Sequence, residues 1–133
     1  MGKKRILIID DDVDFSDLNK AVLENSGFEV VTAFSGREGM DKVQFESPDL
    51  IMLDLMMEKH DSGFGFAGKI KADPRYKNIP ILMVSSVAEE TGYDVSQELD
   101  GYWMKTDDFM NKPAPPEELV KRINSLLERA KKG

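Results

Sequence analysis

The chain contains no cysteine, which excludes whole classes of functional site, and it has only one histidine. Without cysteine there can be no disulfide framework and no thiolate-bound metal. A chain without cysteine also fits a reducing compartment. The single histidine, His60, lies in a polar segment, so we expect an exposed side chain there and not a catalytic group or a metal ligand.

Long hydrophobic runs are also missing. Behind the basic start of the chain, the first apolar run covers only residues 6–9, too short for a signal peptide or a membrane span. The formal net charge is -7, which disfavours nonspecific binding to nucleic acid or to an anionic membrane. These features predict a soluble, cytoplasmic domain that binds neither nucleic acid nor membrane directly.

The length of 133 residues is typical of one domain. A chain of this size buries enough surface to fold without disulfides or structural metals. No internal repeat, low-complexity tract or linker divides it. We therefore predict a single domain over residues 1–133, with its core within about residues 4–129.

Short apolar runs predict the strands. Residues 5–9, 50–53 and 81–84 are almost entirely Ile, Leu, Val and Met. Such runs suit strands that are buried on both faces, as in a parallel sheet covered by helices. Residues 28–34 are a further strand candidate, with a β-branched centre, and residues 109–110 are a short fifth.

Amphipathic segments alternate with these strands. In the first segment, Gly27 is a good stop. The apolar positions that repeat there at helical spacing are Phe15, Leu18, Val22 and Leu23. Ser35 and Glu38 match a capping box and open a second helix.

Three more helices are expected. Asp73 and Pro74 end a third helix, and residues 87–99 are a weaker candidate for a fourth because they contain Gly92. The last helix begins at Pro115-Pro116. Its predicted inner face consists of Leu119, Val120, Ile123, Leu126 and Leu127. Alternation of strands and helices throughout predicts an α/β domain with right-handed crossovers.

Chemically active side chains gather where the predicted strands end. Asp10, Asp11, Asp54 and Ser85 follow or close such strands, and Lys112 follows the fifth. In open α/β sheets the functional crevice lies at the carboxyl ends of the strands. Three carboxylates brought together repel one another, and at least one stays protonated unless a cation joins them. Mg²⁺ suits this site, because it binds through few carboxylates and accepts phosphate oxygens.

A hydroxyl at Ser85 and the ammonium group of Lys112 supply donors for an anion at the same place. Carboxylate, divalent metal, hydroxyl and amine are the groups that stabilise a phosphoryl group in transfer. The pattern therefore indicates phosphoryl chemistry.

With these residues the chain resembles the receiver domain of two-component response regulators, from about Lys4 to Arg129. Each motif alone is weak, but all five occur in order and each lies at a strand end. The matching positions are the acidic pair Asp10 and Asp11, the phosphoacceptor Asp54, the hydroxyl Ser85, the lysine Lys112 before Pro113, and the aromatic switch Phe109.

The resemblance implies a flavodoxin-like, doubly wound, five-stranded parallel sheet in the order 2-1-3-4-5, with about five helices. It also implies Mg²⁺-dependent transfer of a phosphoryl group to Asp54 from a phosphohistidine on a sensor histidine kinase or a phosphotransfer protein. Such a domain is not an enzyme with a separate substrate. It assists its own phosphorylation and dephosphorylation, and so switches a face that binds an unknown downstream protein.

The resemblance assigns a role to each residue of the metal site. Asp11 and Asp54 would bind Mg²⁺ directly, together with the backbone carbonyl of Met56. Asp10 would hold a metal-bound water.

The remaining positions serve the phosphoryl group. Ser85 and Lys112 would contact its oxygens, and their inward movement would bias a two-state element that includes Phe109.

Two stretches depart from the family pattern. Residues 58–68 begin with Glu58, where the family often has proline, and are rich in glycine, so the third helix is expected to start late or to be mobile. Residues 86–108 are longer than usual. We expect these two stretches to form the surface that a partner protein recognises.

Two other functions compete with phosphoryl acceptance. A pseudo-receiver would keep the fold as a binding module without being phosphorylated, although the intact set of site residues weighs against it. A phosphatase of the haloacid-dehalogenase type would use a nucleophile within residues 10–12. That reading leaves Asp54 unexplained, and Asp14 occupies a place where that family has a hydrophobic residue or threonine.

No output domain follows the last predicted helix, so the expectation is either a stand-alone regulator or part of a longer protein.

Overall fold

The computed structural model describes residues 2–54, 63–85, 108–112 and 114–132. Predictions for a fourth helix within 87–99, for Met56 and for His60 lie outside these residues. The same holds for residues 58–62 and 86–107 of the two atypical stretches, whereas residues 63–68 are described and belong to a helix.

Within the described residues, five strands form one parallel sheet in the order β2-β1-β3-β4-β5. The predicted order and the predicted fold class are confirmed. The strands are β1 (Arg5–Ile9), β2 (Glu29–Ala33), β3 (Leu50–Asp54), β4 (Ile81–Ser85) and β5 (Asp108–Asn111). The bounds of β1 are as expected, and those of the other strands differ from the expectation by one residue at one or both ends. As a result, Asp54 and Ser85 are the last residues of their strands and do not follow them.

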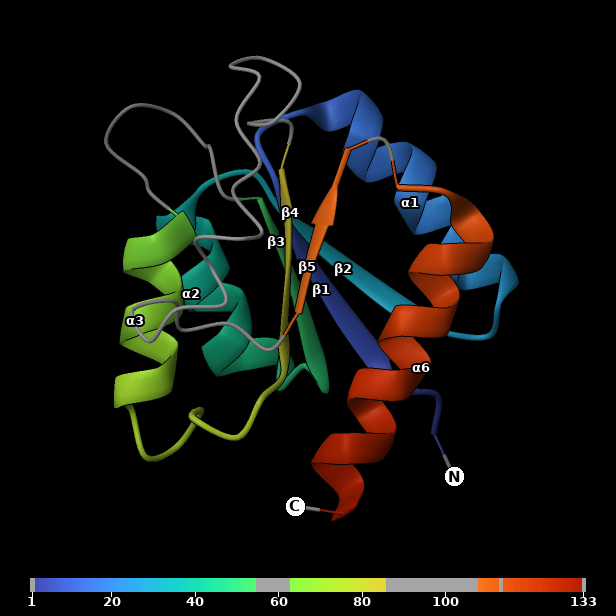
Figure 1. The fold of residues 1–133 in the computed structure, drawn as a ribbon. Helices are drawn as coiled ribbons and strands as arrows, with labels where there is room; N and C mark the ends of the chain where they lie inside the picture. The colour runs from blue at the N-terminus through green and yellow to red at the C-terminus, as the bar shows by residue number, and fades with distance from the viewer. Residues whose placement is uncertain (1, 55–62, 86–107, 113, 133) are drawn as a thin grey trace.

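Four helices are described, two on each face of the sheet. Figure 1 shows α2 and α3 on one face, with α1 and α6 on the other. The helices are α1 (Val13–Asn25), α2 (Gly36–Glu46), α3 (Gly63–Ala72) and α6 (Pro116–Lys132). None of them is long and apolar enough to cross a membrane.

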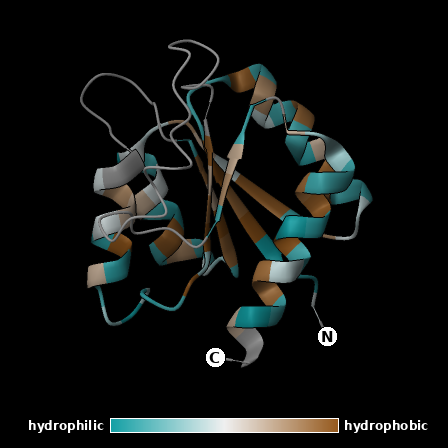
Figure 2. Ribbon diagram, in the orientation of Figure 1, coloured by the Kyte–Doolittle hydropathy of each residue, from teal (hydrophilic) through white to brown (hydrophobic). Residues whose placement is uncertain are grey.

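Alternate residues of the central strands supply two separate cores, which explains the continuous apolar runs of the sequence. Odd-numbered strand residues such as Leu7, Ile51 and Met83 pack beneath α2 and α3. Even-numbered ones such as Ile8 and Met52 pack beneath α1 and α6. Figure 2 accordingly shows the central strands mostly in the colour of hydrophobic residues. By the same alternation, even-numbered residues at the strand ends should face the side of α1 and α6.

The buried face of α1 differs in part from the set of apolar positions that helical spacing selects. Leu18, which shares the helical spacing of its apolar neighbours, is 63% exposed. Leu23 is buried as expected, together with the polar residues Ser16 and Asn19. Asn19 is satisfied because its side-chain nitrogen donates to the carbonyl of Phe15 at 2.7 Å. The helix is therefore rotated relative to the face that hydrophobicity alone selects.

Helix α1 is capped at both ends, and the predicted stop at Gly27 is confirmed. Asp12 caps α1, and its Oδ1 accepts from the backbone N–H of Phe15 at 3.0 Å. At the other end, Gly27 has a φ of 95°. The N–H of Phe28 donates to the carbonyl of Leu23 at 3.0 Å, and the N–H of Gly27 to that of Glu24 at 3.1 Å. These two bonds form a Schellman motif.

Gly27→Ala is expected to lower the free energy of unfolding by about 1 kcal/mol, because an L side chain is strained in this left-handed conformation. A Cβ at this position would meet no atom within 4 Å, so the cost is one of backbone conformation alone. Urea unfolding measures it.

Gly68→Ala is the matched control, since it lies within α3 and its Cβ would also meet no atom within 4 Å. It should raise stability by about 0.5–1 kcal/mol. A stabilising Gly27→Ala would contradict this account of the cap.

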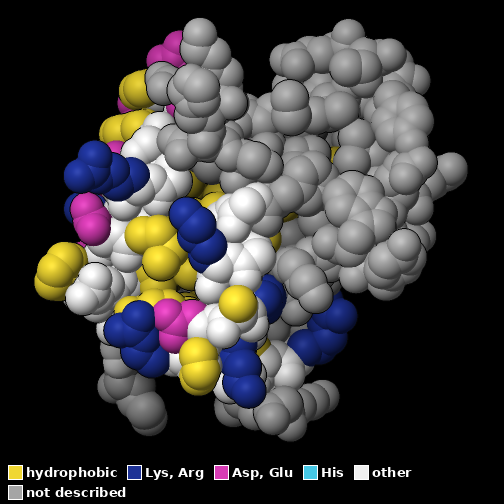
Figure 3. Space-filling model, turned by 90° about the vertical axis from the view of Figure 1, so that its left-hand side faces the viewer, with side chains coloured by type: hydrophobic (Ala, Val, Ile, Leu, Met, Phe, Trp, Pro, Cys, Tyr) yellow, Lys and Arg dark blue, Asp and Glu magenta, His cyan; other side chains and the backbone are white. Residues whose placement is uncertain are grey.

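Basic side chains gather around the end of α3. Lys69 and Lys71 lie in its last turn, and Arg75 and Lys77 follow in the connection to β4. Figure 3 shows Lys and Arg side chains over the face that α2 and α3 cover. Lys71 Nζ donates to the carbonyl of Ile79 at 2.9 Å, which ties the helix to this connection. Cations at a helix C-terminus offset its dipole, so this cluster has a structural explanation.

Candidate functional site

The register of the sheet brings two carboxylates together. β1 and β3 are adjacent, and Ile9 pairs with Leu53. The next residue along each strand is an aspartate, Asp10 or Asp54. Both are buried, with exposed fractions of 2% and 4%. Both numbers are even, which places the side chains on the side of α1 and α6. The carboxyl groups of Asp10 and Asp54 therefore lie next to each other at the same edge of the sheet.

Asp10 is held from two directions. Its Oδ1 accepts from the backbone N–H of Asp12 at 2.9 Å, and its own N–H donates to the carbonyl of Ala33 at 3.1 Å. Its Oδ2 lies 3.0 Å from Nζ of Lys112. The carboxyl group therefore has a fixed orientation.

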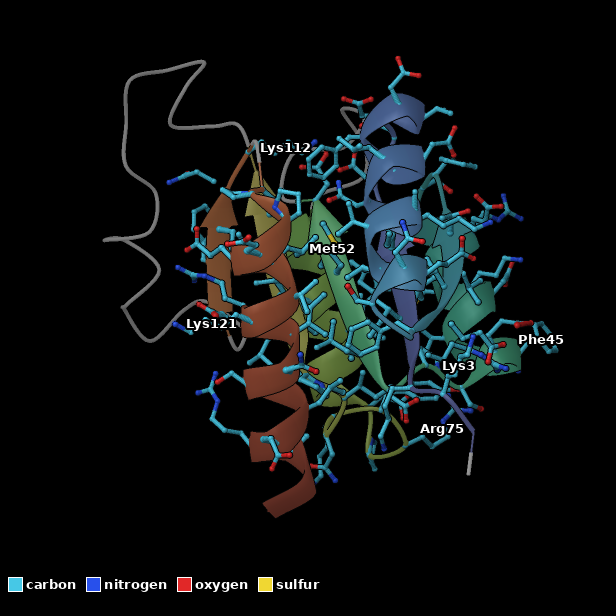
Figure 4. The ribbon with its side chains drawn as sticks, turned by 90° about the vertical axis from the view of Figure 1, so that its right-hand side faces the viewer. Lys3, Phe45, Met52, Arg75, Lys112 and Lys121 are labelled. Carbon is cyan, nitrogen blue, oxygen red and sulfur yellow. The ribbon has the colours of Figure 1, made fainter. Side chains whose placement is uncertain are left out.

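Lys112 reaches the site from the far edge of the sheet. It follows β5, which is separated from β3 by β4, and its Nζ lies 3.9 Å from Oδ1 of Asp54. Figure 4 shows Lys112 at the carboxyl-end edge of the sheet, whereas Lys121 lies on the outer side of α6. Only 14% of the Lys112 side chain is exposed. One partly buried ammonium group thus faces two buried carboxylates.

Asp11 completes a group of three carboxylates. One oxygen from each of Asp10, Asp11 and Asp54 lies within 4.8 Å of the others, and Asp11 is the exposed member. The ammonium group of Lys112 carries one positive charge beside these three carboxyl groups. Hard oxygen ligands at this spacing suit a divalent cation such as Mg²⁺. These three carboxylates therefore fit the Mg²⁺ ion that the sequence suggests. The site is open to solvent at Asp11.

Burial raises the pKa of the Asp10 carboxyl above its ordinary value, because the charged form is poorly solvated. The hydrogen bond from Asp12 and the ammonium group of Lys112 act in the opposite direction. The folded state therefore binds this proton more tightly than the unfolded state. The free energy of unfolding therefore falls as the pH rises through the folded-state pKa of Asp10.

Asp10→Asn is expected to raise the free energy of unfolding at neutral pH without divalent metal and to flatten this pH dependence. Urea unfolding in EDTA from about pH 4 to about pH 8 measures both effects. Asp41→Asn, an exposed change on α2, serves as the control. An Asp10→Asn profile with the wild-type slope would contradict the assignment.

The other predicted site residues are placed only in part. Ser85 ends β4 beside Asn111, and its neighbour Val84 pairs with Asp54, so its backbone lies at the same edge of the sheet. Its side chain lies outside the described part of the structure, and so does all of Met56. Phe109 lies on β5, half-buried against the core beneath α2 and α3.

Two features of the site were not anticipated from the sequence. The ring centroid of Phe15 lies 4.3 Å from Nζ of Lys112. The sequence feature that could have indicated this contact is an aromatic residue in the first turn of the helix that follows the acidic pair.

The second feature fastens β5 to α6. The guanidinium of Arg122 donates to Oδ1 of Asp108 and to the carbonyl of Phe109, both at 2.9 Å. This contact steadies the strand that leads to Lys112. No short sequence motif indicates it.

A comparison with family models matches residues 6–124 to the response regulator receiver domain. The match covers four of the described strands completely, all of β1 except Arg5, and all of the acidic cluster. It includes about half of α6 and ends within that helix.

Curated relatives of known name agree with this match. A probable transcriptional regulator, ycf27, from Cyanophora paradoxa is 36% identical over 97% of the chain. The DNA-binding dual master transcriptional regulator RpaA from Synechocystis sp. is 38% identical over 94% of it. The alignments cover 50% and 49% of these two proteins, so the chain spans about half the length of the curated relatives it matches.

Solved structures show the same fold. A CheY-like response regulator receiver domain protein from Methanospirillum hungatei JF-1 superposes with a TM-score of 0.84 at 26% identity, over 98% of both chains.

Proposed function

Because this chain belongs to the family of response regulator receiver domains, we propose that it accepts a phosphoryl group on Asp54. The donor is a phosphohistidine of a sensor histidine kinase or a phosphotransfer protein in the cytoplasm. One observation supports this assignment most strongly. Asp54 is buried at the end of a central strand, beside two further carboxylates and within 3.9 Å of an ammonium group.

The reaction is a transfer between two nucleophiles. A carboxylate oxygen of Asp54 attacks phosphorus, and the bond between phosphorus and the histidine nitrogen breaks, leaving its electron pair on that nitrogen. Lys112 is near enough to contact a phosphoryl oxygen on Asp54 and to balance part of its charge. The hydroxyl of Ser85 is proposed as a second donor to these oxygens.

Mg²⁺ would be held by Asp11, Asp54 and the backbone carbonyl of Met56, with Asp10 acting through a water. Bound there, it supplies charge neutralisation at the phosphoryl oxygens. Asp10, whose carboxyl group has a fixed orientation, would orient that water, and the exposure of Asp11 leaves the site open to the donor.

Phosphorylation is proposed to act on partners through β5. The aspartyl phosphate adds about one negative charge to the site, which draws Lys112 and Ser85 toward it. Phe109 lies three residues before Lys112 on the same segment and is half-buried. A change in its packing would alter the surface that the downstream protein reads.

Incubation with acetyl phosphate, with Mg²⁺ or with EDTA, tests this function on a phosphate-affinity gel. We expect a shifted band that requires Mg²⁺ and disappears when EDTA is added first. An unshifted wild-type protein in Mg²⁺ would instead favour the pseudo-receiver. Turnover of a generic phosphate ester that survives Asp54→Ala would favour the phosphatase.

A further inference from the structure

Lys112 has a partner that carries no charge. Its Nζ lies 4.3 Å from the centroid of the Phe15 ring, 3.0 Å from Oδ2 of Asp10 and 3.9 Å from Oδ1 of Asp54. The ammonium group is therefore bounded by two carboxylates and one aromatic ring. Because the lysine side chain is only 14% exposed, water competes weakly for this contact.

The ring is held in place by the start of α1. The backbone N–H of Phe15 donates to Oδ1 of Asp12 at 3.0 Å, and its carbonyl accepts from the side chain of Asn19 at 2.7 Å. The half-buried ring also packs against the core beneath α1 and α6. These contacts order the backbone on either side of the ring, so the ring offers a fixed surface to the lysine.

The negative face of an aromatic ring attracts a cation, most strongly where water is excluded. The two carboxylates next to Lys112 are also the proposed partners of the metal and the phosphoryl group, so they are not dedicated to the lysine. The ring has no such second role in the site. It can hold the ammonium group over the site whether or not the carboxylates are engaged.

We propose that Phe15 is a positioning residue for Lys112, and that its ring face sets the place from which the ammonium group contacts the phosphoryl group on Asp54. This inference rests on the proposed function. It gives α1 a direct part in the phosphoryl site, beyond the cap that Asp12 provides.

Phe15→Leu removes the π-face and keeps an apolar side chain of similar bulk. We expect phosphorylation by acetyl phosphate to become about threefold to tenfold slower, as the loss of a partly desolvated cation–π contact predicts. Phe15→Tyr keeps the face and should retain most of the rate. Fluorinated phenylalanines at this position, which weaken the quadrupole at nearly constant shape, should slow the reaction stepwise.

A Lys112→Met background separates positioning from packing. If the ring acts through the lysine, Phe15→Leu should have no further effect on the slow residual rate in that background. A merely structural ring would slow both backgrounds equally. Urea unfolding of each variant checks that the fold is retained.

A second readout needs no phosphodonor. In the wild type, the ring current of Phe15 should shift the NMR resonances of the Lys112 ε-methylene upfield, and Phe15→Leu should return them to ordinary values. Unshifted wild-type resonances, a Phe15→Leu variant with the wild-type rate, or an equal loss in both backgrounds would each overturn the proposal. A wild-type protein that accepts no phosphoryl group while showing the shifted resonances would refute the proposed function and leave the ring–lysine contact standing.

Discussion

Asp54→Asn is expected to abolish phosphorylation by acetyl phosphate and by a phosphohistidine donor. The amide keeps the size of the carboxylate but is a poor nucleophile and carries no charge. Because Asp54 is one of three clustered carboxylates, the substitution also relieves repulsion, so the fold should persist. Band shifts on phosphate-affinity gels measure the loss.

Asp41→Asn is the matched control, since it makes the same chemical change on the exposed surface of α2. It should be phosphorylated like the wild type. A Mg²⁺-dependent band shift that survives in Asp54→Asn would place the acceptor elsewhere.

Lys112→Met is expected to slow phosphorylation by about a hundredfold, the usual scale for removing one preorganised donor from a transition state. The methionine keeps the length of the side chain and removes the only cation described within salt-bridge reach of Asp10 and Asp54. Rates measured at saturating Mg²⁺ separate this effect from weaker metal binding.

Lys121→Met is the control, because Lys121 is exposed on α6 and lies outside the site in Figure 4. Its rate should match the wild type. Equal effects of the two lysine substitutions would indicate that overall charge, and not a local contact, controls the reaction.

The strands were predictable from sequence because both faces of the sheet are covered. Residues such as Ile8 and Leu53 are fully buried, so the central strands β1, β3 and β4 are apolar along almost their whole length. In a strand with one face in water, apolar and polar residues would have alternated along the sequence. The short β5 was harder to recognise, because only Met110 within it is buried.

The carboxylates of the site were predictable for a related reason. Parallel strands bring their carboxyl ends to one edge, so polar residues that end buried runs must meet there. This argument places Asp10 and Asp54 together without knowledge of any side-chain conformation.

What sequence reasoning missed depends on three-dimensional packing. Leu18 is exposed and Asn19 is buried because of the way in which α1 packs against the sheet. Phe15 and Lys112, which are in contact, lie 97 positions apart in the sequence. Hydrophobic spacing within one helix carries no information about such a distant partner.

The position of the phosphoryl group on the loaded protein tests the central claim most directly. Borohydride reduction converts an aspartyl phosphate to homoserine, which peptide mass spectrometry can locate. We predict homoserine at position 54 after loading with Mg²⁺ and acetyl phosphate, and unmodified Asp10 and Asp11. Homoserine at position 10 or 11, or a loaded protein with Asp54 unmodified, would contradict the account.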